Sequence, residues 1–345
     1  MPPNNAVGAS AWESASTQAL LEWRLCDLGL DLRGTWVEGP IERLHAELKA
    51  KRLRVRPHCW LSEEWFSPDG IPGIAIPFYL VHPRLRRLER LQMLEVEGGT
   101  RQDCLRILRH EAGHAMQHAF NLHRRKKWRE IFGSSTVPYP DFYQPTPGSR
   151  RYVVHLPYWY AQAHPDEDFA ETFAVWLTPG STWKRDYKGS PALRKLAYVD
   201  ELMQELADKT PPVKSRSRPD PLHRIKTTLA EHYKARRARH EIASARASDR
   251  DLYRLFARPI NASRRSPSAS SFLRSHRTEI RRLVARSTGK HELALDSILV
   301  EMIGRTKALK LRAVGPKRRL VIDLAILLSS RSAEFGYPGK DWHAL

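Results

Sequence analysis

The stretch RHEAGHAMQH, residues 109–118, lies inside the strongest predicted helix of the chain and contains the pattern His-Glu-x-x-His. Thr100, followed by Asp103 three residues later, resembles a capping box at the start of this helix. Apolar residues then recur at helical spacing from Leu105 to about Leu122. This capped, amphipathic pattern predicts a long helix with one face packed against a core.

On such a helix His110 and His114 lie one turn apart on the same face, so both imidazoles can bind one metal ion. Glu111 is offset by one residue and can lie beside a water molecule rather than on the metal. Zinc lowers the pKa of a bound water, and Glu111 can then take its proton as general base. The pattern also arises by chance in a chain with 15 histidines, so a third ligand is needed to support the site.

His118 is the nearest candidate for the third ligand, but helix geometry excludes it. It follows His110 by eight residues, which is about 12 Å along a continuous helix. Metal–ligand bonds of about 2 Å cannot bridge that distance. A helix broken by a glycine before a later histidine would solve the problem, but Gln117 and Phe120 occupy those two positions. We therefore predict that His118 is a helix residue that binds no metal.

A second predicted helix, from Pro165 to just before Thr178, supplies a better candidate. Glu167 and Glu171 lie one turn apart and share a face of this helix. The opposite face is expected to point to the core and carries aromatic residues, namely Phe169, Phe173 and Trp176. Two such glutamates can also be simply solvated. In the metal interpretation Glu167 is the third ligand, and Glu171 accepts a hydrogen bond from the outer N–H of a ligand histidine.

These two blocks together resemble the gluzincin metallopeptidases, whose third zinc ligand is a glutamate on a second helix. The sequence EDFAETF, residues 167–173, is most similar to the lethal-factor-like peptidases, and HPDEDFAETFAVWL, residues 164–177, resembles a group of bacterial proteins labelled putative zinc-binding metallopeptidases. The specific resemblance covers residues 110–118 and 160–177, and loosely the region 19–210. It implies one Zn²⁺ ion held by His110, His114 and Glu167, and a protein or peptide substrate.

The lethal-factor-like peptidases also carry a tyrosine seven residues before the ligand glutamate, and Tyr160 occupies that position. The resemblance implies that Tyr160 stabilises the oxyanion of the tetrahedral intermediate. Tyr152 and Tyr158 compete for this role, and a packing role for each of them stays open. The gap of 53 residues between the second histidine and the glutamate is longer than in thermolysin-like gluzincins. Its Pro/Tyr-rich segment, residues 137–148, is expected to shape a cleft or a lid.

Charge divides the chain into two parts. Residues 211–345 contain 30 of the 58 basic and 12 of the 38 acidic residues, a net charge of +18, whereas the first 210 residues carry only +2. We predict a disordered leader at 1–16, a zinc metallopeptidase domain at 19–210, a linker at 211–219 and a basic helical domain at 220–345. The predicted class is α+β, with a zincin-like domain followed by a mostly α-helical one. Strands are expected at Leu53–Pro57 and Gly73–Val81.

The basic part can bind nucleic acid or another polyanion, because phosphates attract clustered lysine and arginine. It carries no zinc-finger, RRM or KH signature. A helical bundle with a solvated, charged face explains the same pattern, and an acidic protein partner is equally admissible. The alternative for the whole chain is a nucleic-acid-associated or structural protein that keeps a non-catalytic metal site.

The three cysteines, Cys26, Cys59 and Cys104, are an odd number and widely spaced, which favours a reducing compartment over a disulfide framework. The N-terminus lacks a signal-peptide pattern, and the late apolar run Leu320–Leu328 is too short to span a membrane. We therefore predict a cytoplasmic protein without membrane attachment. Its predicted function is the hydrolysis of peptide bonds by a zinc-activated water with Glu111 as general base.

Overall fold

The structure is a computed structural model that describes residues 11–140, 142–240, 249–263, 266–333 and 337–338. These residues fall into two compact units, one within Met1–Lys234 together with Pro338–Leu345 and one within Ala235–Tyr337. The division between the units lies between Lys234 and Ala235, whereas the charge pattern predicted a domain that begins at residue 220. Each unit is described separately below.

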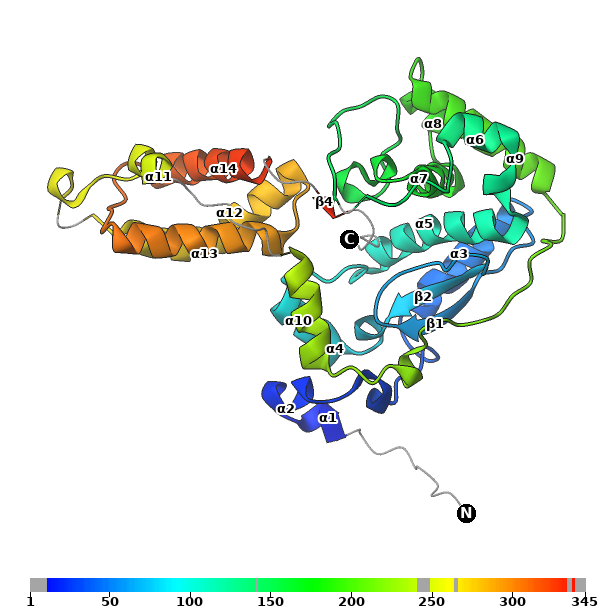
Figure 1. Ribbon diagram of the computed structural model, residues 1–345, viewed down its shortest axis with the longest axis horizontal. Helices are drawn as coiled ribbons and strands as arrows, with labels where there is room; N and C mark the ends of the chain where they lie inside the picture. The colour runs from blue at the N-terminus through cyan, green and yellow to red at the C-terminus, as the bar shows by residue number, and fades with distance from the viewer. Residues whose placement is uncertain (1–10, 141, 241–248, 264–265, 334–336, 339–345) are drawn as a thin grey trace. The chain divides into compact units, whose positions relative to one another are not determined.

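Helices dominate the chain, and the strands are few and short, as Figure 1 shows. The class is therefore α+β, as predicted. No helix in the described ranges is long and apolar enough to cross a membrane. The elements in chain order are α1 (Ala11–Ser14), α2 (Thr17–Leu21), the 3-10 helix η1 (Leu25–Leu28), α3 (Glu38–Ala50), β1 (His58–Ser62), β2 (Gly73–Pro77), η2 (Phe78–Val81), α4 (Pro83–Met93), α5 (Arg101–Phe120), η3 (Leu122–Arg124), α6 (Lys126–Phe132), β3 (Phe142–Tyr143), η4 (Pro157–Gln162), α7 (Pro165–Leu177), α8 (Trp183–Asp186), α9 (Pro191–Leu206), η5 (Leu222–Arg224), α10 (Leu229–His240), α11 (Asp249–Leu255), η6 (Pro259–Asn261), α12 (Ala269–Thr288), α13 (Glu292–Ala308), α14 (Lys317–Ala333) and β4 (Tyr337–Pro338).

The first described residues are folded. Trp12 in α1 is 1% exposed, and its indole N–H donates to the carbonyl oxygen of Leu28 at 3.0 Å. Ser16 caps α2 by accepting a hydrogen bond from the backbone N–H of Ala19. The prediction of a disordered leader is thus wrong for residues 11–16, because a buried tryptophan anchors them, and residues 1–10 lie outside the described part of the chain.

A small parallel sheet lies beside the central helix of the first unit. β1 and β2 pair from His58 with Gly73 to Ser62 with Pro77, and the whole of β2 is buried. β2 contacts α5 (Figure 1). The strand predicted at Leu53–Pro57 is wrong: alternate residues there are buried, but no described strand pairs with them. The strand predicted to reach Val81 ends at Pro77, because the chain continues as the 3-10 helix η2.

The core of the first unit forms around α5 and α7, which pack against each other. Helix α5 also contacts α3 and β2, and α7 also contacts α6, α9 and η4 (Figure 1). The aromatic face predicted for the second helix is buried, with Phe169 and Phe173 at 0% and Trp176 at 4% exposure. The opposite face of α7 is therefore directed at α5.

The segment predicted as a linker, residues 211–219, is part of the first unit and hydrogen-bonds to residues near β1 and α5. The backbone N–H of Val213 donates to the carbonyl oxygen of Ala119 at 3.2 Å. The indole N–H of Trp60 donates to the carbonyl oxygen of Pro219 at 2.9 Å. A ring nitrogen of His58 bonds the carbonyl oxygen of Ser217 at 2.8 Å. These bonds hold the segment along β1 and the end of α5.

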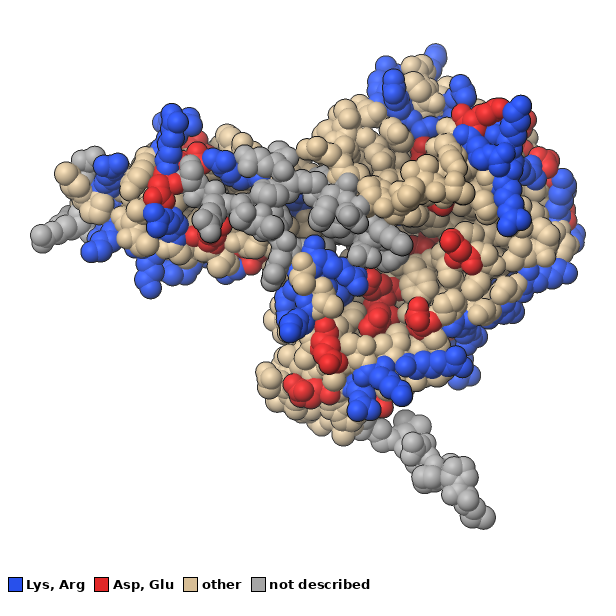
Figure 2. Space-filling view, viewed as in Figure 1, with Lys and Arg blue, Asp and Glu red and all other residues tan. Residues whose placement is uncertain are grey.

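The second unit has a helical core in which α12 packs against α13 and α14, and α11 packs against α13 and α14. Its arginines neutralise several acidic residues within the unit: the buried Arg281 bonds Glu292 at 2.6 Å and Asp296 at 2.8 Å, and Arg305 bonds Asp249 at 2.5 Å. On the face shown in Figure 2, basic side chains are interspersed with acidic ones over this unit.

Candidate metal centre

Helix α5 presents His110 and His114 on one face, one turn apart. Its start shows one half of the predicted capping box, since Thr100 Oγ1 accepts from the backbone N–H of Asp103 at 3.1 Å. The Asp103 carboxylate accepts from the Thr100 hydroxyl at 2.7 Å. The helix continues without a break to Phe120, so the two histidines keep their ideal spacing.

Helix α7 presents Glu167 and Glu171 toward α5. Pro165 occupies the first turn, as predicted, and the side chain of His164 caps the helix by accepting from the backbone N–H of Asp166 at 3.1 Å. Both glutamates are buried, Glu167 at 5% and Glu171 at 0% exposure. The alternative interpretation, in which these glutamates are simply solvated, is therefore wrong.

The two helices approach each other closely at Gly113, which lies between the two histidines in sequence. A Cβ atom at this position would lie 2.7 Å from the Cα atom of Ala170 and 3.1 Å from its carbonyl oxygen. Glycine costs about 1 kcal/mol relative to alanine in a helix interior, so its presence here has a packing reason. The absent side chain lets the backbone of α7 approach closely enough for Glu167 to reach the histidines.

Replacing Gly113 with alanine is expected to destabilise the first unit by about 1–3 kcal/mol and to weaken zinc binding, because the helices must separate. Chemical denaturation and a competition titration with a zinc chelator measure the two effects. Gly304→Ala in α13 is the matched control: its Cβ would meet nothing within 4 Å, so it should be neutral or stabilising. If Gly113→Ala unfolds at the same denaturant concentration as the parent protein, the packing of α5 against α7 does not require glycine at this position.

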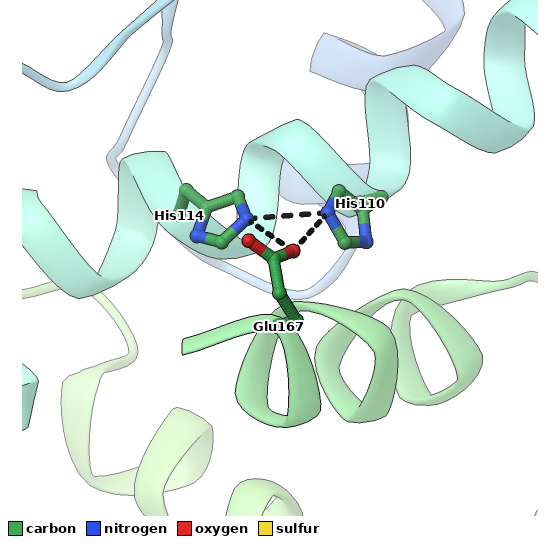
Figure 3. Close-up of side chains that lie close together, drawn as sticks. All are labelled: His110, His114 and Glu167. Carbon is green, nitrogen blue, oxygen red and sulfur yellow. Dashed lines mark hydrogen bonds and ion pairs between the residues drawn. The ribbon is translucent and has the colours of Figure 1, made fainter. Parts of the chain in front are cut away.

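Three donor atoms from the two helices converge on one point (Figure 3). Oε2 of Glu167 lies 3.0 Å from Nε2 of His110 and 3.2 Å from Nε2 of His114, and the two Nε2 atoms are 3.2 Å apart. Donor atoms bound tetrahedrally to zinc at about 2.0–2.1 Å lie about 3.3 Å from one another. The two imidazoles and one carboxylate therefore have the identity and the spacing of a zinc ligand set.

The electrostatics of this group favour positive charge between the helices. Burial alone would lower the pKa of His110, but hydrogen bonds and negative charge from Glu167 and Glu171 outweigh it and raise that pKa to about 10. Burial would likewise raise the pKa of Glu167, but the two histidines hold it well below its usual value. Two buried carboxylates thus stabilise a cation at this point, which is what a divalent metal ion requires.

The part of the chain that carries both helices also matches the model of a protein family. Residues 84–201 match the family described as "Putative zinc-binding metallo-peptidase". The match includes α5 and α7, and it confirms over these residues the resemblance predicted from the two sequence blocks. It ends at residue 201, before the basic part of the chain. No curated protein and no solved structure matches the chain. The finer resemblance to gluzincins and lethal-factor-like peptidases stays a prediction.

Within the matched residues, Glu171 bonds the outer side of His110, which forms the metal group together with His114 and Glu167. Its Oε1 lies 2.9 Å from Nδ1 of His110. Its Oε2 accepts from the backbone N–H groups of His155 and Leu156 at 3.1 and 2.8 Å. The carboxylate therefore links His110 to the segment before η4, which is the contact predicted for a residue that orients a ligand.

Glu111 lies on α5 beside the metal group but is not part of it. It is 3% exposed, and among the described residues no group hydrogen-bonds its Oε2 atom. Burial lowers the pKa of His114, and the charges of Glu167 and, to a smaller extent, Glu111 raise it above its usual value. Burial raises the pKa of Tyr160, and the charge of Glu111 adds a small part to that rise. One carboxylate oxygen of Glu111 is thus buried near the metal group and accepts no hydrogen bond from the described residues.

Tyr160 lies against the metal group, whereas Tyr152 does not. The ring of Tyr160 lies 5.6 Å from that of His110, and burial followed by the charge of Glu167 raises the pKa of its phenol well above the usual value. Tyr152 instead packs under the ammonium group of Lys195, at 4.0 Å from the ring centre. The side chain of Tyr158 lies outside the described part of the structure.

His118 lies apart from the metal group, as helix geometry predicted. It is buried at 5% exposure; its Nδ1 accepts from the backbone N–H of Gly70 at 3.2 Å, and its Nε2 lies 3.6 Å from Asp69. Burial lowers its pKa to about 4, so it is a neutral histidine that ties the loop before β2 to α5.

The sequence did not predict Tyr139 as a site residue, yet its hydroxyl bonds a member of the metal group. Its hydroxyl donates to Oε1 of Glu167 at 2.9 Å, on the oxygen that does not face the histidines. The only sequence signal was its place in the Pro/Tyr-rich segment 137–148, which predicted a cleft or a lid but no particular residue.

Proposed function

We propose that the chain is a zinc-dependent metallopeptidase that hydrolyses peptide bonds, with His110, His114 and Glu167 as the zinc ligands. The observation that carries this proposal is the convergence of the three donor atoms within 3.2 Å of one another. The family match over the same residues supports the zinc and the class of protein or peptide substrate.

When bound, zinc supplies a Lewis acid that polarises a carbonyl group and makes water more acidic. The protein supplies the base: Glu111 accepts a proton from the attacking water through its buried, unpartnered Oε2 and passes it to the leaving amine. Its low exposure keeps bulk water away from the carboxylate.

Tyr160 is proposed to donate a hydrogen bond to the oxyanion that forms from the substrate carbonyl. Its raised pKa keeps the phenol protonated, so it can act only as a donor when the oxyanion approaches. Glu171 accepts from His110 Nδ1, which leaves Nε2 of that imidazole as the atom that faces the metal.

Removing the metal tests the proposal. The purified protein is expected to contain about one zinc ion per chain and to cleave peptides from an unbiased library. Dialysis against a chelator should remove both the zinc and the activity, and added zinc should restore both. Protein that contains zinc but cleaves no peptide would favour the non-catalytic metal site; protein that binds no zinc would contradict the proposal itself.

The basic part of the chain has no assigned role in this reaction. Nucleic-acid binding stays a prediction from its charge, and no comparison supports it. Binding of the full chain to DNA or RNA that weakens steeply with salt would support it, and no binding at low salt would contradict it. A reducing compartment such as the cytoplasm also stays a prediction, consistent with three unpaired cysteines.

A further inference from the structure

The carboxylate of Glu167 is shared between two sets of partners. Its Oε2 faces His110 and His114, while its Oε1 accepts the hydroxyl proton of Tyr139 at 2.9 Å. A carboxylate on a flexible side chain can rotate and offer either oxygen, or both, to a metal. The hydrogen bond from Tyr139 occupies one oxygen and leaves the other directed at the histidines.

Tyr139 is itself held in place by the residue that caps α7. The ring of His164 stacks on that of Tyr139, with centres 3.8 Å apart and an angle of 13° between the planes. Nε2 of His164 lies 2.7 Å from the carbonyl oxygen of Val137, and its Nδ1 accepts from the backbone N–H of Asp166. One neutral tautomer, with the proton on Nε2, satisfies both bonds. The buried His164 thus ties the segment that carries Tyr139 to the first turn of the helix that carries Glu167.

We propose that Tyr139 is a positioning residue that fixes Glu167 as a zinc ligand through a single oxygen, and that His164 acts through Tyr139. The inference rests on the proposed zinc site. Groups that hydrogen-bond a metal ligand from the outside typically change metal affinity about 10- to 100-fold when they are removed. The Tyr139 hydroxyl donates to an oxygen of Glu167, a proposed zinc ligand, so its removal should change zinc affinity within this range.

Tyr139→Phe removes only the hydroxyl group and is expected to weaken zinc binding about tenfold, as measured by competition with a chromogenic chelator. Tyr198→Phe is the matched control, because this phenol is also buried but packs against Phe132 and Lys127, away from the metal group. The thermal midpoint of both metal-free variants should stay near that of the parent. Zinc affinity equal to that of the parent in Tyr139→Phe would overturn the proposal, whereas a parent protein that binds no zinc would instead overturn the proposed function.

Cobalt substitution provides a readout that a purely structural role would not change. Loss of the hydroxyl lets both oxygens of Glu167 reach the metal, so the visible absorption of the Co²⁺ form should weaken and shift as the coordination number rises. An unchanged spectrum in Tyr139→Phe would contradict the single-oxygen role. The Tyr198→Phe spectrum should match that of the parent.

The role of His164 is tested by a double-mutant cycle. His164→Asn keeps a good helix cap but removes the stacked ring, and it should weaken zinc binding in the parent. In the Tyr139→Phe background it should cost little more, because the hydroxyl that it positions is already absent. Fully additive losses would show that His164 does not act through Tyr139.

Discussion

Replacing Glu111 with glutamine is expected to leave zinc bound and to lower kcat for peptide hydrolysis about 10²- to 10⁴-fold. The amide has nearly the same shape as the carboxylate but cannot take a proton from water. Glu111 lies outside the group of convergent donor atoms, so zinc content should stay at the parent level. Metal analysis and steady-state kinetics on a peptide substrate measure the two quantities.

Glu130→Gln is the matched control for this substitution, since Glu130 is an exposed residue of α6 that pairs only weakly with Lys126, at 3.9 Å. It should change neither zinc content nor kcat. Full activity in Glu111→Gln would falsify the general-base role. Loss of zinc in that variant would instead show that Glu111 is a metal ligand.

Replacing Glu167 with alanine is expected to abolish stoichiometric zinc binding, because it removes one of three ligands and leaves two buried histidines without their carboxylate. The loss should exceed the roughly 10- to 100-fold effect of an outer partner. Glu171→Gln belongs in that smaller class: the amide oxygen can still accept from the backbone of residues 155 and 156, but the bond to His110 changes. Zinc affinity, measured by competition, should therefore fall more in Glu167→Ala than in Glu171→Gln.

Glu201→Ala on α9 controls for the loss of a carboxylate, since Glu201 is exposed and bonds only Lys127 among the described contacts. It should bind zinc like the parent. Thermal denaturation of the metal-free variants shows whether Glu167→Ala is folded, so that a loss of metal is not mistaken for a loss of structure. Full zinc occupancy in a folded Glu167→Ala variant would rule out Glu167 as the third ligand.

The helices that carry the metal group were predictable because their signals are local. Thr100 with Asp103, and Pro165 at the first turn, mark helix starts within a few residues of sequence. The buried anchors outside these helices gave weaker signals. Trp12 folds back onto Leu28, and residues 211–219 bond β1, so a polar leader and a Pro/Ser/Arg-rich linker were predicted where the structure has packed chain. The composition of a short segment cannot predict that the segment will bond to a residue distant in sequence.

The sequence by itself determined which residues share a face: His110 with His114 on one helix, and Glu167 with Glu171 on the other. This follows from the helical repeat alone, and it also excluded His118. Only the tertiary structure decided that the two faces meet, at a spacing set by Gly113 against Ala170, and that Tyr139 reaches Glu167 from outside both helices. The physical reason is that periodicity depends on neighbours along the chain, whereas the distance between two helices depends on the packing of side chains far apart in sequence.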